Sequence, residues 1–324
     1  MISTIQKNTW KGLVDQRERL PHALLLHGAP GVGKLALAER FAQFLLCEKR
    51  GQGTEPCGSC EGCRWFLSGN HPDVRYIEPE VIARYVAVPE EGEEERSKEK
   101  KKPSIVIKID EVRALAGFVN VKSHRGGLRV AIVHPAEDIT EQAANALLKN
   151  LEEPPAGAIF ILVSHRPARL LPTIRSRCVP VPVPVPDAKA AAAWLGAQGV
   201  RNAERWLAFA GGAPLRVLDY ATGDRGGAIE RVLRGIASED RGALAEVKDR
   251  DALETLAEVL QKMALDRAFA ALIGRSKYGG AAVAGDARAW LAYARALGRS
   301  RTLTRHPLNP RLFAAEMVAG MPTD

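Results

Sequence analysis

A glycine-rich segment between an apolar strand and an amphipathic helix constrains the fold of this chain more than any other feature. The segment G-A-P-G-V-G-K, residues 28–34, matches the pattern G-x-x-x-x-G-K. It follows an apolar run at residues 22–27 and precedes a helical pattern at residues 35–47. Strand, glycine turn and helix in this order predict a loop whose backbone N–H groups hold phosphate oxygens, with a lysine adding positive charge.

The position after this lysine departs from the pattern. It holds Leu35 where a Ser or Thr hydroxyl would ligate Mg²⁺. We therefore expect Gly28, Gly31, Gly33 and Lys34 to form a degenerate nucleotide-binding site, which holds phosphate but is poorly equipped to cleave it. A tight strand-to-helix turn without a ligand is the alternative.

An active loop of this kind also needs a strand that ends in Asp and Glu, the Walker B pattern, to hold Mg²⁺ and orient water. The string I-V-I-K-I-D-E ends in Asp110 and Glu111, but a lysine interrupts it and Asp110 is predicted to cap a helix. The string R-V-A-I-V-H is the better buried strand, because a central parallel strand reads as a continuous apolar run. It ends in His134 and Pro135, so the Mg²⁺ site is predicted to be lost.

Four of the five cysteines lie in one short stretch, with the spacing C-x9-C-x2-C-x2-C. Four thiolates suit tetrahedral Zn²⁺ and leave no open position for catalysis, so Cys47, Cys57, Cys60 and Cys63 are predicted to form a structural zinc module at about residues 47–70. Disulfides need an oxidising compartment, which the N-terminus does not indicate. An iron–sulfur cluster is the remaining alternative.

Composition and charge predict a protein without membrane contact. The 324 residues include no run near the roughly 20 apolar residues of a membrane span. The first 17 residues have no apolar signal-peptide core, which predicts a cytoplasmic protein. The net charge of +8 is compatible with an anionic partner, but solvated helix faces explain the basic C-terminal third better than direct DNA contact, because aromatic stacking residues are sparse there.

Three further runs make a family resemblance specific. They are A-A-N-A-L-L-K-N-L-E-E-P-P at 143–155, the strand that ends in Ser164, and L-P-T-I-R-S-R-C at 171–178. With the glycine loop and the cysteine module, they resemble the AAA+ subunits of bacterial DNA polymerase III clamp loaders. Because the loop and the Walker B pattern are both defective, the chain is similar to the delta prime type rather than to the gamma/tau ATPase.

This resemblance implies roles for individual residues. In the family, the Ser-Arg-Cys motif supplies an arginine finger to the ATP of a neighbouring subunit, which assigns Ser176, Arg177 and Cys178 here. The chemistry agrees, because a guanidinium stabilises charge on a transferring phosphoryl group and can act in trans. An ordinary surface ion pair is the alternative for Arg177. Ser164 occupies the sensor 1 position and Arg216 resembles a sensor 2 residue.

The expected fold is an α/β P-loop domain of the AAA+ (RecA-like) type, followed by helical domains. Alternating valines and prolines at 179–186 predict an extended segment that ends the nucleotide-binding-like domain, residues 1–183. By resemblance, a small helical lid at 184–223 and an all-α collar for oligomerisation at 224–324 follow. Residues 89–103 are a block of acids and then bases, which predicts a mobile charged insertion in the first domain.

The function implied is that of a non-hydrolysing clamp-loader subunit. In a hetero-oligomeric ring with subunits of the gamma/tau and delta types, it would help ATPase neighbours load the sliding clamp onto primer-template DNA during replication. The chain would belong to the DNA polymerase III holoenzyme without ATPase or polymerase activity of its own. Structural Zn²⁺ is expected, and binding of ATP or ADP is left open. Two alternatives are an active AAA+ ATPase (gamma/tau-like), with Asp110 and Glu111 as Walker B, and a zinc-dependent nucleic-acid binder.

Overall fold

The computed structural model divides the chain into two compact units, Met1–Val185 and Pro186–Asp324. It describes residues 2–17, 19–50, 53–83, 103–121, 123, 127–279, 285–304 and 309–322. The charged insertion predicted at 89–103 lies outside these residues except for Pro103. The predicted lid and collar both fall in the second unit from residue 186 onward, and the division into three domains stays a prediction.

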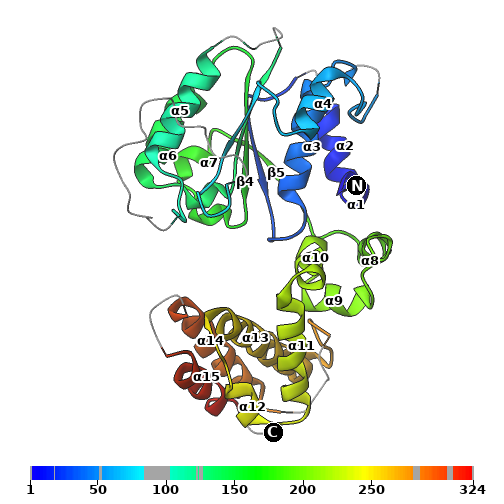
Figure 1. Cartoon of the computed structure of the whole chain (residues 1–324), viewed down its shortest axis with the longest axis vertical. Coiled ribbons are helices and arrows are strands. Elements are labelled where there is room, and N and C mark those ends of the chain that lie inside the picture. The colour runs from blue at the N-terminus through cyan, green and yellow to red at the C-terminus, as the bar shows by residue number, and fades with distance from the viewer. Residues whose placement is uncertain are drawn as a thin grey trace. The chain divides into compact units, whose positions relative to one another are not determined.

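A five-stranded sheet forms the centre of the first unit (Figure 1). The strand order is β2-β3-β4-β1-β5 and every neighbouring pair is parallel. The three inner strands are apolar and almost entirely buried, as expected for a parallel sheet with helices on both faces. The strands are β1 (Ala23–His27), β2 (Val74–Ile77), β3 (Arg129–Val133), β4 (Ala158–Ser164) and β5 (Val179–Pro182).

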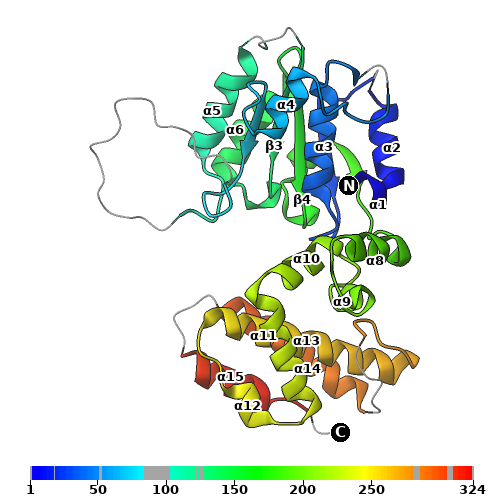
Figure 2. The ribbon, with the colours of Figure 1, turned by 45° about the vertical axis from the view of Figure 1, so that its right-hand side comes forward.

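Helices cover both faces of this sheet, with α1 to α4 on one side and α5 to α7 on the other (Figures 1 and 2). On the first side, the ring of Trp10 packs edge-on against Phe41 and Phe44. On the second side, Leu115 and Leu147 pack against Phe160 of β4. The helices are α1 (Ile2–Ile5), α2 (Lys7–Asp15), α3 (Lys34–Leu46), α4 (Glu61–Leu67), α5 (Ile109–Asn120), α6 (Glu141–Glu152) and α7 (Pro172–Arg175), with short 3-10 turns η2 (Ala136–Asp138) and η3 (Pro167–Arg169).

Strand β5 is an edge strand built from alternating valines and prolines. It pairs with β1 alone, and the N–H of Val183 just beyond it donates to the carbonyl of His27 at 2.8 Å. Proline has no N–H, but an edge strand needs donors on one side only. The extended conformation predicted for this segment is therefore confirmed at residues 179–182, where it also joins the sheet.

The described part of the second unit is all-α, as predicted. One apolar cluster includes Leu195, Leu207 and Val217 of the first three helices. Another, with Leu256 and Trp290, lies between the long helix α13 and its neighbours (Figure 2). The helices are α8 (Ala188–Ala197), α9 (Ala203–Phe209), α10 (Pro214–Thr222), α11 (Asp224–Ala237), α12 (Arg241–Ala245), α13 (Arg250–Ile273), α14 (Ala287–Leu303) and α15 (Pro310–Ala319).

Candidate functional site

The glycine segment forms a tight loop between β1 and α3. A Cβ atom at Gly28 would lie 2.2 Å from the carbonyl oxygen of Val183, so only glycine fits there. Gly33 is the N-cap of α3 and has a φ of 97°, a left-handed conformation in which a side chain is strained. Gly31 also has a positive φ, 79°. The loop thus presents the free N–H groups of the first turn of α3, as a phosphate loop requires.

Lys34 is buried at the first position of α3, with 2% of its surface exposed. Its Nζ donates hydrogen bonds to the carbonyl oxygens of Gly28 at 2.9 Å and Ala29 at 2.6 Å. Burial lowers the pKa of Lys34 to about 8, opposed by the charge of Glu137. Leu35 beside it is half-buried and offers no oxygen. The loop therefore has the amides and the cation of a phosphate site, but not the hydroxyl that would ligate Mg²⁺.

Histidines and glutamates stand at the carboxyl edge of the sheet, close to where Asp and Glu would hold Mg²⁺. His134 follows β3, and its Nδ1 lies 3.4 Å from Oε1 of Glu78, the residue after β2. His165 follows β4, and its ring centroid lies 5.4 Å from that of His134. The backbone N–H of His165 donates to both carboxylate oxygens of Glu137, at 2.9 and 3.2 Å. Glu78 therefore faces the ring of His134, whereas Glu137 accepts hydrogen bonds from the backbone of His165.

Sequence reasoning missed Glu78 and Glu137. The short strand V-R-Y-I followed by a glutamate was the available signal for Glu78, whereas Glu137 lies in the 3-10 turn η2 and is brought to the site by chain reversal after β3. Burial and, to a lesser extent, the charge of Lys34 lower the pKa of His165 to about 4. The His165 ring is therefore neutral near pH 7 and adds no positive charge that would attract an anion.

The other acidic pair, Asp110 and Glu111, lies in the first turn of α5. The carboxylate of Glu111 accepts a hydrogen bond from the backbone N–H of Lys108 at 2.5 Å. Oδ1 of Asp110 lies 3.4 Å from Nη1 of Arg113 in an exposed ion pair. The residues before the helix form an isolated bridge outside the sheet. Acidic side chains here stabilise a helix N-terminus rather than end a strand.

Ser164 is the last residue of β4 and pairs in register with His27 of β1. Its side chain is fully buried, and its hydroxyl oxygen accepts a hydrogen bond from the N–H of Arg166 at 3.1 Å. Because Gly28 follows His27, Ser164 lies at the same sheet edge as the start of the glycine loop.

Ser176, Arg177 and Cys178 lie between α7 and β5. The Nη2 atom of Arg177 lies 2.6 Å from Oε1 of Glu152, and 34% of the arginine side chain is exposed. Its Nη1 donates to the carbonyl of Thr173 at 3.0 Å. Burial raises the pKa of the Cys178 thiol to about 12, so this cysteine is unreactive. The ion pair considered for Arg177 is thus present in the single chain, in a partly accessible position.

Arg216 belongs to the second unit and lies on α10. Its Nη2 atom is 2.8 Å from Oε1 of Glu258, a carboxylate on α13 whose side chain is 2% exposed. Arg225 and Lys262 contact the same carboxylate, each at 2.7 Å. Arg216 therefore takes part in a buried ion network that links α10, α11 and α13.

The four predicted cysteine ligands come together at the ends of two helices. Cys47 follows α3 and Cys60 caps α4, and the four Sγ atoms lie within 4.8 Å of one another. Backbone N–H groups of Cys57, Cys60 and Cys63 each donate to a cysteine sulfur at 3.3 to 3.4 Å. Such hydrogen bonds stabilise thiolates, the form in which cysteine ligates a metal. This cluster can hold a metal ion, and all four thiols are free of disulfides.

Comparison with known proteins identifies the family. The family model described as DNA polymerase III, delta subunit, matches residues 5–187. The chain belongs to this family. A DNA polymerase III subunit delta' of Pseudomonas aeruginosa is 41% identical over 214 residues, which are 65% of this chain and 58% of the relative. The delta' subunit of Escherichia coli is 34% identical over 225 residues, 68% of this chain and 61% of that protein.

The chain therefore spans less than two thirds of either relative. A solved structure of a DNA polymerase III gamma subunit-related protein from Thermotoga maritima is 18% identical, with a TM-score of 0.49, and the match covers 96% of this chain and 97% of that one. The family match ends near the boundary between the two units, so the glycine loop, the cysteine cluster and Arg177 all lie within it.

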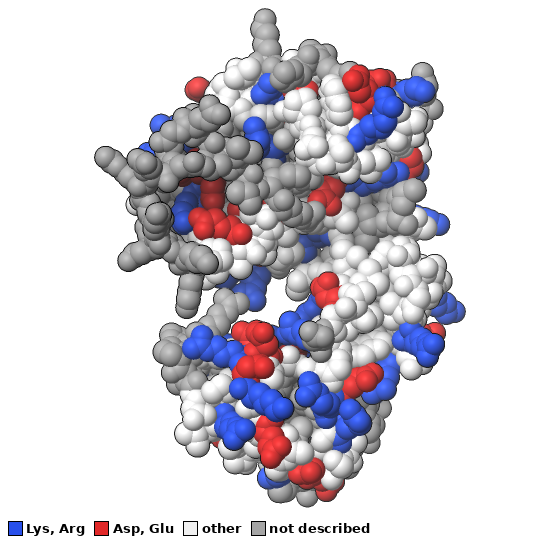
Figure 3. All heavy atoms as spheres, in the orientation of Figure 1, with Lys and Arg blue, Asp and Glu red and all other residues white. Residues whose placement is uncertain are grey.

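The distribution of surface charge and the hydropathy of the helices complete the description of this family member. On the face of the second unit seen in Figure 3, Lys and Arg side chains alternate with Asp and Glu rather than forming one continuous basic patch. Across the described ranges, no helix combines the length and the apolar character needed to span a bilayer.

Proposed function

We propose that this chain is a non-hydrolysing, delta prime-type subunit of a bacterial DNA polymerase III clamp loader. With subunits of the gamma/tau and delta types in a hetero-oligomeric ring, it helps ATPase neighbours place the sliding clamp on primer-template DNA. One observation carries the proposal: at the carboxyl edge of the sheet, His134 pairs with Glu78 where Mg²⁺ ligands belong, beside a loop that has Leu35 in place of a hydroxyl.

Hydrolysis of ATP by this fold depends on Mg²⁺, which bridges phosphate oxygens and neutralises developing charge. Mg²⁺ requires oxygen ligands in near-octahedral geometry. Here the strand that should carry the acids ends in an imidazole, and the loop position that should carry an oxygen is aliphatic. Lys34 and the loop amides still suit a phosphate group, so ATP or ADP that binds is retained rather than cleaved.

The competing function, an active gamma/tau-like ATPase, requires Asp110 and Glu111 at a strand end. Both side chains instead serve the first turn of α5. The proposal therefore predicts no ATP turnover above background by the purified chain with Mg²⁺. Turnover that is abolished by Lys34→Ala would replace the proposal with the competing function.

We assign Arg177 as an arginine finger that acts on the ATP of a neighbouring subunit. The Arg177 side chain is one third exposed, and its guanidinium is paired with the half-exposed Glu152, a contact of low strength that a phosphate group can displace. Ser176 and Cys178 position it, Ser176 through a hydroxyl that donates to the carbonyl of Thr173. In the assembled ring, the guanidinium would stabilise the transferring phosphoryl group.

The test is a reconstituted clamp loader that contains Arg177→Ala. Loss of an arginine finger lowers turnover at the affected site by about 10³-fold or more, so DNA-stimulated hydrolysis at that interface and clamp loading should both be lost. Arg175→Ala, an exposed arginine two residues earlier, is the matched control and should behave as wild type. Both complexes should assemble normally by size-exclusion chromatography. Unchanged hydrolysis in the Arg177→Ala complex would remove this residue from the mechanism.

We further propose that the cysteine cluster holds structural Zn²⁺. Four sulfur ligands with hydrogen-bonded thiolates suit Zn²⁺ and leave no site for substrate. Residues 184–223 and 224–324 are assigned as lid and collar. In the lid, Arg216 serves as the candidate sensor 2 residue only if a nucleotide competes successfully with Glu258 for its guanidinium.

A further inference from the structure

A cavity of about 670 Å³ opens at the amino-terminal edge of the sheet, opposite the edge that carries the glycine loop. Its residues lie before β1 and β3, near the end of α3 and just after it, at the start of β4, and in the loop between α6 and β4. This volume falls within the range of about 300–1,000 Å³ that is typical of ligand sites. The cavity is independent of the nucleotide site, because the two are separated by the length of the strands. Its lining includes the apolar residues Leu20, Leu45, Leu128 and Ile159 and the basic residues Arg17 and Arg50.

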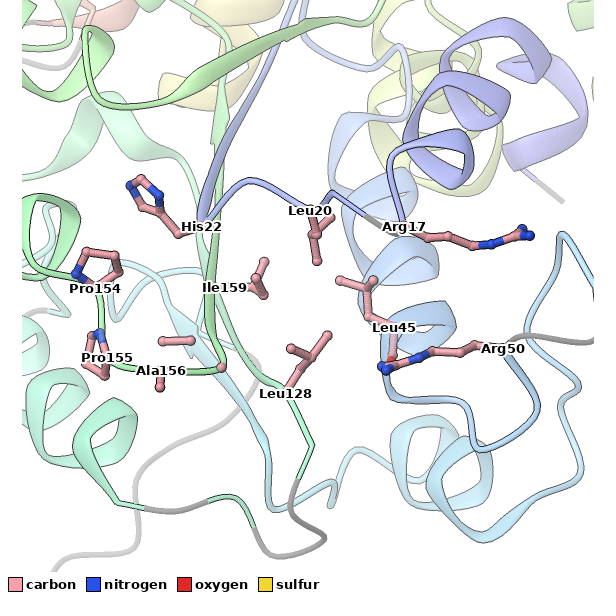
Figure 4. Close-up of a pocket in the computed structure, with 12 residues that line it drawn as sticks. Arg17, Leu20, His22, Leu45, Arg50, Leu128, Pro154, Pro155, Ala156 and Ile159 are labelled. Atoms are coloured by element: carbon pink, nitrogen blue, oxygen red, sulfur yellow. The ribbon is translucent and has the colours of Figure 1, made fainter.

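The floor of the cavity is apolar. Leu45 and Ile159 are buried, while Leu20 and Leu128 are half-buried. Figure 4 shows these four side chains gathered at the centre, with Pro154, Pro155 and Ala156 along one side. An occupant with an apolar side chain would complete the burial of this floor, at about 25 cal/mol for each Å² removed from water.

The charged side chains that line the cavity are positive. Arg17 and Arg50 are its charged lining residues, and no acidic side chain is among the lining residues that the structure describes. The Nη1 of Arg50 donates to the carbonyl of Leu45 at 2.7 Å, which holds the guanidinium beside the apolar floor (Figure 4). Arg17 contributes its stem, and its guanidinium reaches away from the centre in that view. Among the described residues, neither arginine forms an ion pair. A carboxylate next to an apolar side chain is the complementary group.

We propose that this cavity binds a short peptide segment of a partner protein, in which an apolar side chain stands next to an Asp, a Glu or a terminal carboxylate. The apolar side chain enters between Leu20, Leu128 and Ile159, and the carboxylate meets Arg50. A nucleic-acid strand fits less well, because the described lining includes no Phe, Tyr or Trp to stack on bases. This site goes beyond the proposed function and requires neither ATP nor DNA.

The test uses the full chain and two immobilised libraries of nine-residue peptides. One library combines Asp and Glu with Leu, Ile, Val and Phe, and the other replaces the acids by Lys and Arg. We expect the wild-type chain to retain sequences from the acidic library only. Ala156→Trp should abolish this binding, because Ala156 is exposed and a tryptophan there fills the cavity without entering the core. Arg50→Glu should weaken the selected peptides by at least about tenfold, as loss of a charge-assisted hydrogen bond does.

Lys49→Glu is the matched control, since this exposed neighbour has the same charge change but does not line the cavity. It should leave the affinity of the selected peptides within about twofold. Thermal unfolding and metal content of every variant verify the fold. Equal retention by the wild-type and Ala156→Trp chains would overturn the proposal. Retention of the basic library, or displacement of bound peptide by a single-stranded oligonucleotide, would also overturn it. None of these outcomes depends on clamp loading.

Discussion

Replacing Glu258 by glutamine is expected to lower the stability of the second unit by about 3 kcal/mol at pH 7. The side chain of Glu258 is 2% exposed and contacts Arg216, Arg225 and Lys262 at 2.7 to 2.8 Å. It also accepts a hydrogen bond from the hydroxyl of Tyr220 at 3.0 Å. Glutamine keeps the size and loses the charge, so three cations lose their common partner at the junction of α10, α11 and α13.

The magnitude follows from the pKa of Glu258. Burial by itself raises this pKa, but the attraction of Lys262, Arg216 and Arg225 outweighs burial and lowers the pKa from 4.5 to about 2. At about 1.4 kcal/mol per pKa unit, the difference corresponds to about 3 kcal/mol. Because the folded pKa is the lower one, this stabilisation is present above pH 4.5 and is lost as the pH falls toward 2. Near pH 3, about half of it should remain.

The assay is urea unfolding of the full chain, monitored by hydrogen exchange of peptides from α13, which reports the second unit alone. Glu230→Gln is the matched control, because Glu230 is an exposed glutamate on α11. It should change the free energy of unfolding by less than about 0.5 kcal/mol. The reasoning is wrong if Glu258→Gln costs no more than this control. It is also wrong if the difference between wild type and Glu258→Gln stays constant from pH 7 to pH 3.

Two further substitutions test the first unit. Cys60→Ala should eliminate bound zinc, measured by inductively coupled plasma mass spectrometry, and should lower the melting temperature. Cys178→Ala, which removes the cysteine outside the cluster, is the control and should retain zinc. Zinc retained by Cys60→Ala would contradict the metal assignment. Gly28→Ala should destabilise the first unit by about 1–3 kcal/mol in urea unfolding, because its Cβ would meet the carbonyl of Val183 at 2.2 Å. An unchanged free energy of unfolding would contradict this reasoning, because the glycine loop would then be able to move away from Val183 without cost.

Local pattern was sufficient for the elements that surround the glycine loop. The apolar run before it and the helical spacing after it predicted β1 and α3 closely, because a buried strand and an amphipathic helix are both written in neighbouring residues. The edge strand β5 shows the limit of this reasoning. Its prolines argue against a strand, and only the position at the sheet edge, with β1 as its one neighbour, makes the pairing possible.

In the candidate site, too, some features follow from local sequence and others depend on the fold. The spacing of the cysteines predicted a cluster whose sulfur atoms do meet, because most of the ligands lie within a few residues of one another. Glu78 could not be predicted as the partner of His134, since 56 positions separate them along the chain and the parallel pairing of β2 with β3 brings them together. Likewise, the partner of Arg216 is a carboxylate on another helix, which no spacing in the sequence reveals.

The sequence by itself determined what this protein lacks and what it keeps: it has no hydroxyl at Leu35, His134 and Pro135 instead of acids directly after the central strand, four cysteines at metal-binding spacing, and an arginine at 177. These properties depend on the chemistry of single side chains in local motifs. Only the tertiary structure decided which charges face one another, as in the pair of His134 with Glu78 and the cations around Glu258. The reason is physical: burial makes a charge depend on partners that the fold supplies from distant parts of the chain.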